Sequence, residues 1–403
     1  MLNKGQQEIH DLCLRNLFTG NKQVFEYAGA AGTGKTYTMY EICKDSGIPM
    51  SRILPMAYTG AAATVLRKKG FPNATTLHSG LFSALDIPNP NFKKRMTEDE
   101  VDNEFGLPTA PPVITKFIPK TVLPNVDLIV IDEGRMVPNY MRPIIEKFGI
   151  PIIVTGDPNQ LDPVGDEPAY LINNYPVLTE IMRQNANSAI IYIAHKILRG
   201  EPLDTGIYNN QVLVIEEQDL RNEMILASDL VICGTNSTRD KWNKYIRENL
   251  LGFSGPLPNY GERIICRKNN HQIEVDGIEL SNGLLGHVAS CPDIAGFDGR
   301  SYMMDFLPDI LYSPFRNLVC DYEYFSAPAK ARLHYNNPYN HGERFEFGYC
   351  ITTHLAQGSE ARKGIYIDEW FGRDPSIVKK LQYTGVTRFK ESMIFVKRGR
   401  RFY

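Results

Sequence analysis

The sequence predicts an α/β protein whose helices cover a parallel sheet. Three apolar, strand-like segments, at residues 23–27, 126–131 and 151–155, are each followed by glycine or polar residues. Segments with helical periodicity alternate with these strands, an order typical of doubly wound sheets. Because the carboxyl ends of parallel strands meet at one edge of a sheet, we expect a ligand to bind there.

The composition is that of an ordinary protein with a substantial core. The chain has 403 residues, of which 43% are hydrophobic and 22% charged, and its formal net charge is −2. Because the charge gives no global positive field, any site for a polyanion must be a local groove. The seven cysteines are scattered, which argues against paired-cysteine metal or redox motifs and suggests a reducing cytosol. No signal peptide or membrane-length apolar run is evident, so we expect a cytoplasmic protein without membrane partners.

The N-terminal segment, residues 2–6, comes before a helical pattern that ends near Gly20. The amide of Gln6 can donate to one edge atom of adenine and accept from another, so this residue is a candidate for reading a nucleotide base. Taken alone, a polar region that caps the helix explains the same residues more simply. The sequence leaves both interpretations open.

A glycine-rich turn at residues 29–36 carries the strongest signal in the chain. It reads Gly-Ala-Ala-Gly-Thr-Gly-Lys-Thr and matches G-x-x-x-x-G-K-[ST] at every fixed position, between a strand and a helix. Glycines let backbone N–H groups face phosphate oxygens, and the following helix presents its positive end. Lys35 can reach the terminal phosphates, and the Thr36 hydroxyl can hold Mg²⁺. The predicted nucleotide-binding residues are Gly29, Ala31, Gly32, Thr33, Gly34, Lys35 and Thr36.

Two segments after this turn carry small, hydroxyl or imidazole side chains. Residues 52–57 predict a second strand, and the small residues at 60–63 would let another backbone approach closely. The hydroxyl and imidazole groups at 76–79 can contact phosphates or simply cap turns, and both alternatives stay open. The side chains of these segments include those of Thr59, Ala61, Thr76 and His78.

Residues 81–122 have the composition of an insertion. Six prolines surround a charged run at residues 93–104, which excludes this segment from the sheet core. The run at residues 112–118 predicts one arm of a small hairpin with an exposed aromatic residue, Phe117.

Two further strands end in side chains suited to hydrolysis. Asp132 stands at the end of an apolar strand and can hold the Mg²⁺ that bridges the β- and γ-phosphates. The next residue, Glu133, can orient or deprotonate the attacking water. Gln160 follows the strand at residues 151–155 and can sense the γ-phosphate. Together with the glycine-rich turn, these residues favour a nucleotide hydrolase.

In this order, the motifs resemble those of superfamily 1 helicases, in the 5′-to-3′ branch of RecD-like enzymes, and most of all the phage Dda helicase. Residues 2–6 look like the family's adenine motif, and residues 59–62 and 76–79 like its single-strand contact segments. Residues 178–184 resemble its arginine motif, with Arg183 as one arginine finger, and residues 383–388 supply a second, Arg388. Residues 352–360 resemble the segment that grips DNA and touches nucleotide, in which Thr353, His354 and Glu360 are the matching positions.

The resemblance implies two RecA-like P-loop NTPase domains that hold ATP and Mg²⁺ between them. The first would comprise residues 1–80 and 123–172, with a wedge insertion at 81–122. The second would comprise residues 173–251 and 346–403, with an SH3-like β-barrel at 252–345. In that barrel, the Asn282-Gly283 pair predicts a tight hairpin. The aromatic residues at 302–349 can stack on bases or fill a small β core, and either is possible.

The resemblance also implies an ATP-dependent DNA helicase that moves 5′ to 3′ on single-stranded DNA and unwinds duplex. The expected partners are single-stranded DNA, junctions between single- and double-stranded DNA, and replication or recombination proteins. The enzyme is expected to act as a monomer. The enzyme would be nucleoid-associated, or in the host cytoplasm if a phage encodes it. Phe117 is our choice for the residue that splits the duplex. Alternatives are a translocase that displaces proteins without unwinding, a nucleotide switch or small-molecule kinase, and a silent DNA-binding module.

Three positions depart from the family pattern. Gly134-Arg135 follows the carboxylate pair where a variable residue and Ser are frequent, and Asp162 stands where Pro is usual. Leu355 replaces a frequent Lys, which removes one expected phosphate contact from that segment.

Overall fold

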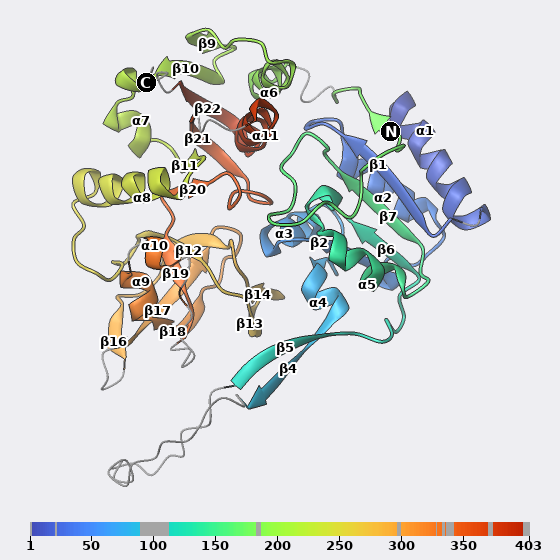
Figure 1. Cartoon of the computed structure of the whole chain (residues 1–403), viewed down its shortest axis with the longest axis horizontal. Coiled ribbons are helices and arrows are strands. Elements are labelled where there is room, and N and C mark those ends of the chain that lie inside the picture. Colours follow the sequence, from blue (N-terminus) through green and yellow to red (C-terminus); the bar gives the residue numbers. More distant parts are fainter. Residues whose placement is uncertain are drawn as a thin grey trace.

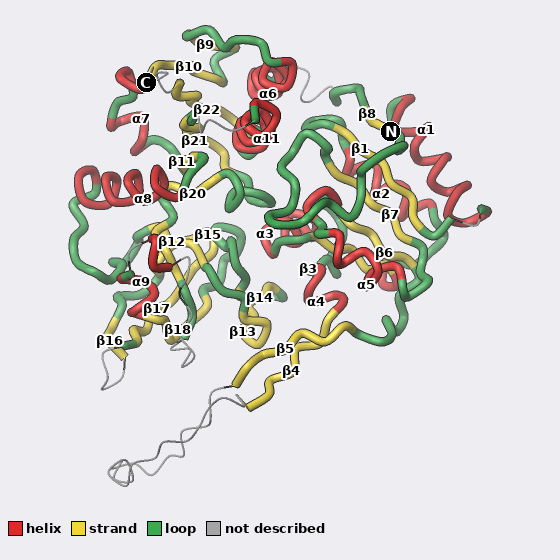
Figure 2. Tube along the Cα trace, in the orientation of Figure 1, coloured by secondary structure: helices red, strands yellow, loops and turns green. Residues whose placement is uncertain are grey.

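The computed structural model describes residues 2–20, 22–88, 113–182, 187–295, 300–327, 329–332, 335, 342–369 and 374–397. Figure 1 shows two helix-covered sheets, an antiparallel insertion next to the second sheet, and a long hairpin that projects from the first domain. Helices flank the strands of both main sheets (Figure 2). None of the helices in these ranges combines the length and the hydropathy that a bilayer crossing requires.

The first sheet is six-stranded and parallel, in the order β3-β2-β6-β7-β1-β8. Its strands are β1 (Val24–Gly29), β2 (Ile53–Ala57), β3 (Thr75–Thr76), β6 (Leu128–Ile131), β7 (Ile152–Gly156) and β8 (Val177–Leu178). Its helices are α1 (Lys4–Leu14), α2 (Lys35–Asp45), α3 (Gly60–Lys68), α4 (Leu77–Leu81) and α5 (Arg142–Glu146).

Both faces of this sheet are buried. In β6, Leu128 and Val130 pack in the cluster that includes α1, α2 and α3, whereas Ile129 and Ile131 pack in the cluster that includes α4 and α5. A strand covered on both sides gains from apolar residues at every position, because each side chain leaves water. This explains the continuous hydrophobic runs in the sequence.

The second sheet is also six-stranded, in the order β20-β11-β21-β22-β10-β9, and only β9 runs antiparallel to its neighbour. Its strands are β9 (Gly206–Tyr208), β10 (Val212–Glu216), β11 (Leu230–Cys233), β20 (Cys350–Thr352), β21 (Ala361–Ile367) and β22 (Phe389–Lys397). The helices α6 (Ala189–Arg199) and α11 (Pro375–Val386) cover one face, and α7 (Asn222–Leu226) and α8 (Asn236–Tyr245) cover the other. The α/β class predicted from the sequence is therefore confirmed in both domains.

The strand pairing extends two of the expected segments. β8 pairs with β1, so the first sheet continues past residue 172. Likewise β19 (Phe345–Phe347) pairs with β12 (Arg263–Cys266), so the second insertion continues past residue 345. The other expected domain boundaries remain predictions.

The first insertion contains the predicted hairpin. β4 (Phe82–Pro88) and β5 (Val113–Pro119) pair antiparallel, and Phe117 lies opposite Ala84. The side chain of Phe117 is 42% exposed. The charged run and most of the prolines that surround it fall at residues 89–112, outside the described residues.

The second insertion is an antiparallel sheet, in the order β16-β17-β15-β12-β19 with β18 on β17, plus a separate hairpin of β13 and β14. Its remaining elements are β13 (Asn270–Val275), β14 (Ile278–Leu280), β15 (Leu285–Val288), β16 (Asp293–Ala295), β17 (Ser301–Pro308), β18 (Phe315–Asp321), α9 (Tyr322–Ser326) and α10 (Ala329–Arg332). The aromatic side chains of Tyr302, Phe306, Phe315 and Phe345 are buried in one cluster. For these residues, the small β core is the correct alternative.

The hairpin predicted at Asn282-Gly283 is wrong. This pair forms a turn between β14 and β15, but β14 pairs with β13 and β15 pairs with β12 and β17. The tight hairpin lies instead at Asp276 and Gly277, both of which have positive φ angles, 51° and 74°. An Asn-Gly pair favours a tight turn, but it does not decide which strands then pair.

The core of the second sheet has no room for a side chain at Gly364. A Cβ atom there would lie 2.5 Å from the carbonyl oxygen of Leu230 and 2.1 Å from the Phe389 ring. We expect Gly364→Ala to lower the free energy of unfolding by about 1–3 kcal/mol, as overpacking does. Urea denaturation measures this, with Gly5→Ala as the control because no heavy atom lies within 3.9 Å of a Cβ at Gly5. Equal stability of the two variants would contradict the prediction.

Candidate functional site

The glycine-rich turn joins β1 to α2 at the carboxyl edge of the first sheet. Gly32 and Gly34 have φ angles of 84° and 81°, in the left-handed region that favours glycine. A Cβ atom at Gly34 would lie 2.5 Å from both Gln6 Nε2 and Met182 Sδ. The turn therefore needs glycine at position 34 for its backbone conformation and for the close approach of two neighbouring segments.

The ammonium group of Lys35 lies on the turn itself. Its Nζ donates to the carbonyl oxygens of Gly29 at 2.8 Å and Ala30 at 3.3 Å. The Tyr27 hydroxyl donates to the carbonyl oxygen of Lys35 at 2.8 Å, which fixes the start of α2. The ammonium group of Lys35 is thus held inside the turn, where it can instead bind the phosphates of a nucleotide.

Thr36 and Asp132 meet as predicted for a Mg²⁺ site. The Thr36 hydroxyl donates to Asp132 Oδ2 at 3.0 Å, across the sheet edge. Hard oxygen donors of this kind suit Mg²⁺, which keeps several waters and takes only one or two protein ligands beside phosphate oxygens. Among the described residues no group of three or more acidic, His or Cys side chains could hold a metal by itself. The pair therefore fits an ion that arrives with a nucleotide.

Glu133 has a strained backbone and a perturbed carboxyl group. Its φ angle is 54°, which is uncommon for a residue other than glycine, asparagine or aspartate. A strained backbone conformation persists only where the surrounding structure enforces it, and such conformations are frequent at functional sites. Burial raises the pKa of Glu133, the adjacent Asp132 raises it further, and Arg388 and Lys35 act in the opposite direction. A carboxyl group with a raised pKa is suited to accept a proton from water.

Gln160 connects the two domains at this point. With its amide nitrogen toward the first domain, Gln160 donates to Glu133 Oε2 at 3.2 Å, and its oxygen accepts from Arg388 Nη2 at 3.2 Å. Both Gln160 and Arg388 are buried. Arg388 is held in turn by the carbonyl oxygen of Thr384, at 3.0 Å from Nε. Three predicted site residues from three segments of the chain thus form one chain of hydrogen bonds.

Tyr383 is a site residue that we did not predict, although it begins the segment at 383–388. Its hydroxyl donates to Asp157 Oδ2 at 2.5 Å and accepts from the backbone N–H of Ala31 at 2.8 Å. Burial and the charge of Asp157 raise the pKa of Tyr383 well above its usual value, so the hydroxyl keeps its proton. A residue of α11 in the second domain therefore binds the glycine-rich turn of the first.

Gln6 takes the helix-capping role and also contacts the turn. Its backbone N–H donates to Asn3 Oδ1 at 2.8 Å, and its Oε1 accepts from the Asn3 N–H at 3.0 Å. Its Nε2 donates to the carbonyl oxygen of Thr33 at 3.1 Å. Both amide atoms are thus engaged with protein, and a role in reading adenine remains a prediction. Met182, another unpredicted neighbour, donates its N–H to the Gly32 carbonyl oxygen at 3.0 Å.

The phosphate-contact candidates of the first domain begin helices. The Thr59 and Thr76 hydroxyls accept from the N–H groups of Ala62 and Ser79, both at 3.2 Å, and so cap α3 and α4. Capping, one of the two alternatives for residues 76–79, is therefore present at Thr76, and Thr59 also caps its helix. Ala61 is buried in the first turn of α3.

His78 lies in a group of aromatic rings at the base of the first insertion. Its ring is 5.6 Å from Phe82, 6.1 Å from Phe117 and 6.3 Å from Tyr58, between centroids. Phe117 therefore lies beside a predicted single-strand contact.

The candidates of the second domain have more varied positions. Thr353 is fully buried and its hydroxyl donates to the Cys233 carbonyl oxygen at 3.2 Å, so its side chain is not accessible in this structure. His354 follows it directly, in the turn after β20. Glu360 is ion-paired with Lys390. Arg183 lies outside the described residues.

Two of the three departures from the family pattern contact each other. Arg135 Nε lies 2.5 Å from Asp162 Oδ1, and Lys380 of α11 lies 2.7 Å from Asp162 Oδ2. Burial acts to raise the pKa of Asp162, but the hydrogen bonds from Lys380 and Arg135 lower it. The unusual pair thus adds an ionic contact between the domains. Gly134 is required because a Cβ there would lie 2.2 Å from Val154 Cγ1.

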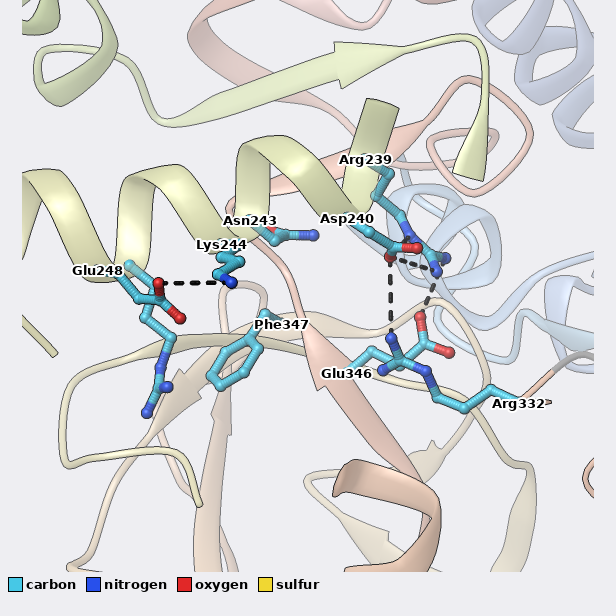
Figure 3. Close-up of a pocket in the computed structure, with 9 residues that line it drawn as sticks. Arg239, Asp240, Asn243, Lys244, Glu248, Arg332, Glu346 and Phe347 are labelled. Atoms are coloured by element: carbon cyan, nitrogen blue, oxygen red, sulfur yellow. Dashed lines mark hydrogen bonds and ion pairs between the residues drawn. The ribbon is translucent and has the colours of Figure 1, made fainter. Parts of the chain in front are cut away.

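A separate cavity of about 220 Å³ lies between α8 and the second insertion (Figure 3). Its lining residues are Arg239, Asp240, Asn243, Lys244, Arg247, Glu248, Arg332, Glu346 and Phe347. Its four basic side chains are all ion-paired, for example Arg239 with Glu346 at 3.0 Å. Because these charges neutralise one another, we assign the cavity a structural role, which is to fasten the insertion to α8.

Comparison with known proteins gives one family match and many structures of the same fold. The family model described as "AAA domain" matches residues 1–219. An uncharacterized protein of Acanthamoeba polyphaga mimivirus is 27% identical over 298 residues, which is 64% of this chain. The chain spans only 58% of the length of that relative.

Three solved structures illustrate the likeness in fold. Pif1 helicases at forked double-stranded DNA have a TM-score of 0.57 at 18% identity and cover 98% of this chain and 92% of theirs. Pif1 from Candida albicans has a TM-score of 0.54 at 15% identity, with 98% and 94% covered. Pif1 from Bacteroides, in complex with ADP-AlF3 and single-stranded DNA, has a TM-score of 0.54 at 16% identity, with 98% and 92% covered. At such identities the likeness establishes the fold, namely two RecA-like domains.

The contact of Tyr383 with Asp157 and Ala31 should contribute to stability. We expect Tyr383→Phe to lower the free energy of unfolding by about 2 kcal/mol, because a buried carboxylate loses a hydrogen-bond donor. Urea denaturation provides the measurement. Tyr312→Phe is the matched control, since Tyr312 is fully exposed and should tolerate the same change. An equal effect of both substitutions would show that the contact does not stabilise the fold.

Proposed function

The chain belongs to the AAA domain family, and on that premise we propose that it is an ATP-dependent DNA helicase. The observation that carries this proposal is the bridge through Gln160, from Glu133 in the first domain to Arg388 in the second. A nucleotide on the glycine-rich turn would lie at the junction of both domains, so hydrolysis there can move one domain against the other. A simple nucleotide switch or small-molecule kinase needs no second domain of this kind.

The same residues account for the steps of hydrolysis. The turn and Lys35 bind the β- and γ-phosphates of ATP, and Glu133 orients a water molecule and accepts its proton. Thr36 and Asp132 would hold Mg²⁺, which when bound would neutralise charge on the phosphates. Arg388 stabilises the negative charge that develops on the γ-phosphate. Arg183 is the proposed second arginine of this site.

Gln160 and Tyr383 would couple this chemistry to domain movement. Gln160 contacts both the proposed base and the arginine, so a change at the γ-phosphate reaches the second domain through one side chain. Tyr383 holds the Ala31 N–H, one of the donors that a phosphate would use. Nucleotide binding and release would therefore shift the contacts of α11 and alter the interdomain cleft.

Single-stranded DNA is the proposed track. It would lie across both domains, against Thr59, Ala61, Thr76 and His78 of the first and His354 of the second, with Thr353 supporting that turn. A structure of the same fold holds ADP-AlF3 and single-stranded DNA together, which supports this pair of ligands. Phe117, beside His78, remains our choice for the aromatic residue that stacks on the end of the duplex.

The finer features of the proposal come from the resemblance in motifs. They are 5′-to-3′ movement, likeness to RecD-like enzymes and the phage Dda helicase, a role for Glu360 at the ribose, and action as a monomer. Service in replication, recombination or repair belongs with them, as does a cytoplasmic location. The Pif1 structures support the superfamily, and these further features are proposals.

ATP turnover tests the assigned site. We expect Lys35→Ala to reduce DNA-stimulated ATPase activity by at least about 100-fold, because a cation at the γ-phosphate is lost. Glu133→Gln should reduce it by about 10²–10⁴-fold through loss of the base. Lys44→Ala, in the last turn of the same helix α2, is the control because Lys44 is 62% exposed. Near-normal turnover in either site variant would remove the assignment.

Direction of movement is tested with two tailed duplexes. We expect ATP-dependent unwinding of a duplex with a 5′ single-stranded tail and none of a duplex with only a 3′ tail. Strand separation is followed by the fluorescence of a quenched label. The opposite preference would place the chain in the other branch of the superfamily. Stimulated ATPase without unwinding of either duplex would favour the translocase.

A further inference from the structure

The hairpin of β13 and β14 reaches from the second insertion to the first domain. Figure 1 shows its tip beside α3 and α4, which carry the proposed DNA contacts. The Arg67 guanidinium donates to the carbonyl oxygen of Gly277 in the hairpin turn. Ser281 packs so closely on α3 that a Cβ at Gly60 would lie 2.0 Å from its Oγ. The hairpin thus covers the surface that single-stranded DNA would need.

Glu279 makes the central polar contact of this interface. Its Oε2 accepts a hydrogen bond from the Ser79 hydroxyl at 2.7 Å, and Ser79 Oγ lies 3.0 Å from Thr76 Oγ1. Lys120 Nζ donates to the carbonyl oxygens of Ser79 and Gly80, at 2.9 and 3.1 Å, and so holds a cation next to this pair. The carboxylate therefore lies on a hydroxyl donor that belongs to a predicted single-strand contact segment.

The electrostatics of the two nearby cations agree with this geometry. Burial lowers the pKa of Lys120, while the negative charge of Glu279 raises it. Burial also lowers the pKa of Arg67, and the charges of Glu274 and Glu279 act in the opposite direction. A hydroxyl on the carboxylate and two cations near it are groups of the kind with which proteins bind a nucleic-acid phosphate.

Given the proposed helicase function, on which this inference rests, we propose that Ser79, Arg67 and Lys120 form a site for a backbone phosphate of single-stranded DNA. Glu279 occupies this site while DNA is absent. The carboxylate stands in for the phosphate: it accepts the hydrogen bond of Ser79 and interacts by charge with Arg67 and Lys120.

DNA must displace the hairpin before it can use this site. The cavity at the interface has a volume of only about 20 Å³ and is lined by residues of both sides, including Arg67, Thr76 and Glu279. That space holds about one water molecule and excludes a phosphate group. Binding of DNA would therefore replace the Glu279 carboxylate on the Ser79 hydroxyl with a phosphate, beside the two cations, and the hairpin works as a cover for the DNA path.

Binding of fluorescein-labelled oligo(dT) to the full-length protein, followed by anisotropy, tests the inference. We expect Glu279→Gln to lower the Kd by roughly tenfold, because the competing carboxylate loses a charge-assisted hydrogen bond. Glu274→Gln is the matched control. It removes the same charge from the same hairpin, but Glu274 is exposed and acts on Arg67 through charge alone. We expect it to change the Kd by about twofold or less.

A second measurement tests the donors themselves. If Lys120 binds a phosphate, Lys120→Gln should weaken binding and reduce the slope of log K against log salt by about 0.7, the value for one contact with single-stranded DNA. A purely structural lysine would leave that slope unchanged. Melting temperatures of all variants report any loss of folding.

The outcomes separate this inference from the function on which it rests. Tight binding by the wild type with equal Kd values for Glu279→Gln and Glu274→Gln, or an unchanged salt slope for Lys120→Gln, would overturn the phosphate site alone. Failure of the wild type to bind oligo(dT) at all, with ATPase activity indifferent to DNA, would overturn the proposed function and the phosphate site with it.

Discussion

The structure depends on the docking of α11 against the loop that follows β7. Four contacts between the domains gather there: Tyr383 with Asp157, Thr384 with the Leu161 N–H, Lys380 with Asp162, and Arg388 with Gln160. Most of these groups are buried, so each would be costly to leave without its partner. The helix α11 and Arg388, which follows it, therefore hold the domains together and contribute to the proposed nucleotide site.

The departures from the family pattern belong to the same contact. Asp162 receives Arg135 from its own domain and Lys380 from the other, so a carboxylate in place of the usual proline adds an ionic link across the cleft. The ion pair of Arg135 and Asp162 is partly buried, so removal of one partner leaves the other with an uncompensated charge. Each of the two unusual residues therefore requires the other. Taken singly, Arg135 and Asp162 each depart from the family pattern, and their contact accounts for both.

A further contact between the domains involves Gly358 and Thr59. Gly358 of the second domain packs on Thr59, and a Cβ at Gly358 would lie 2.3 Å from the Thr59 hydroxyl oxygen. The β13–β14 hairpin covers the neighbouring segment through Glu279 and Ser79. The proposed nucleotide site and the proposed DNA surface thus lie along one interdomain boundary.

The sequence by itself determined the α/β class, the glycine-rich turn, and the meeting of Lys35, Thr36, Asp132, Glu133 and Gln160. Local patterns sufficed because all five follow strands of one parallel sheet, whose carboxyl ends share an edge. The hairpin at Asn282-Gly283 was predicted wrongly because a turn motif says nothing about which strands pair. Only the tertiary structure decided that Tyr383 binds Ala31, 352 positions away, and that Glu279 binds Ser79, 200 positions away. Such contacts arise from the packing of separate domains, and no local period in the chain encodes them.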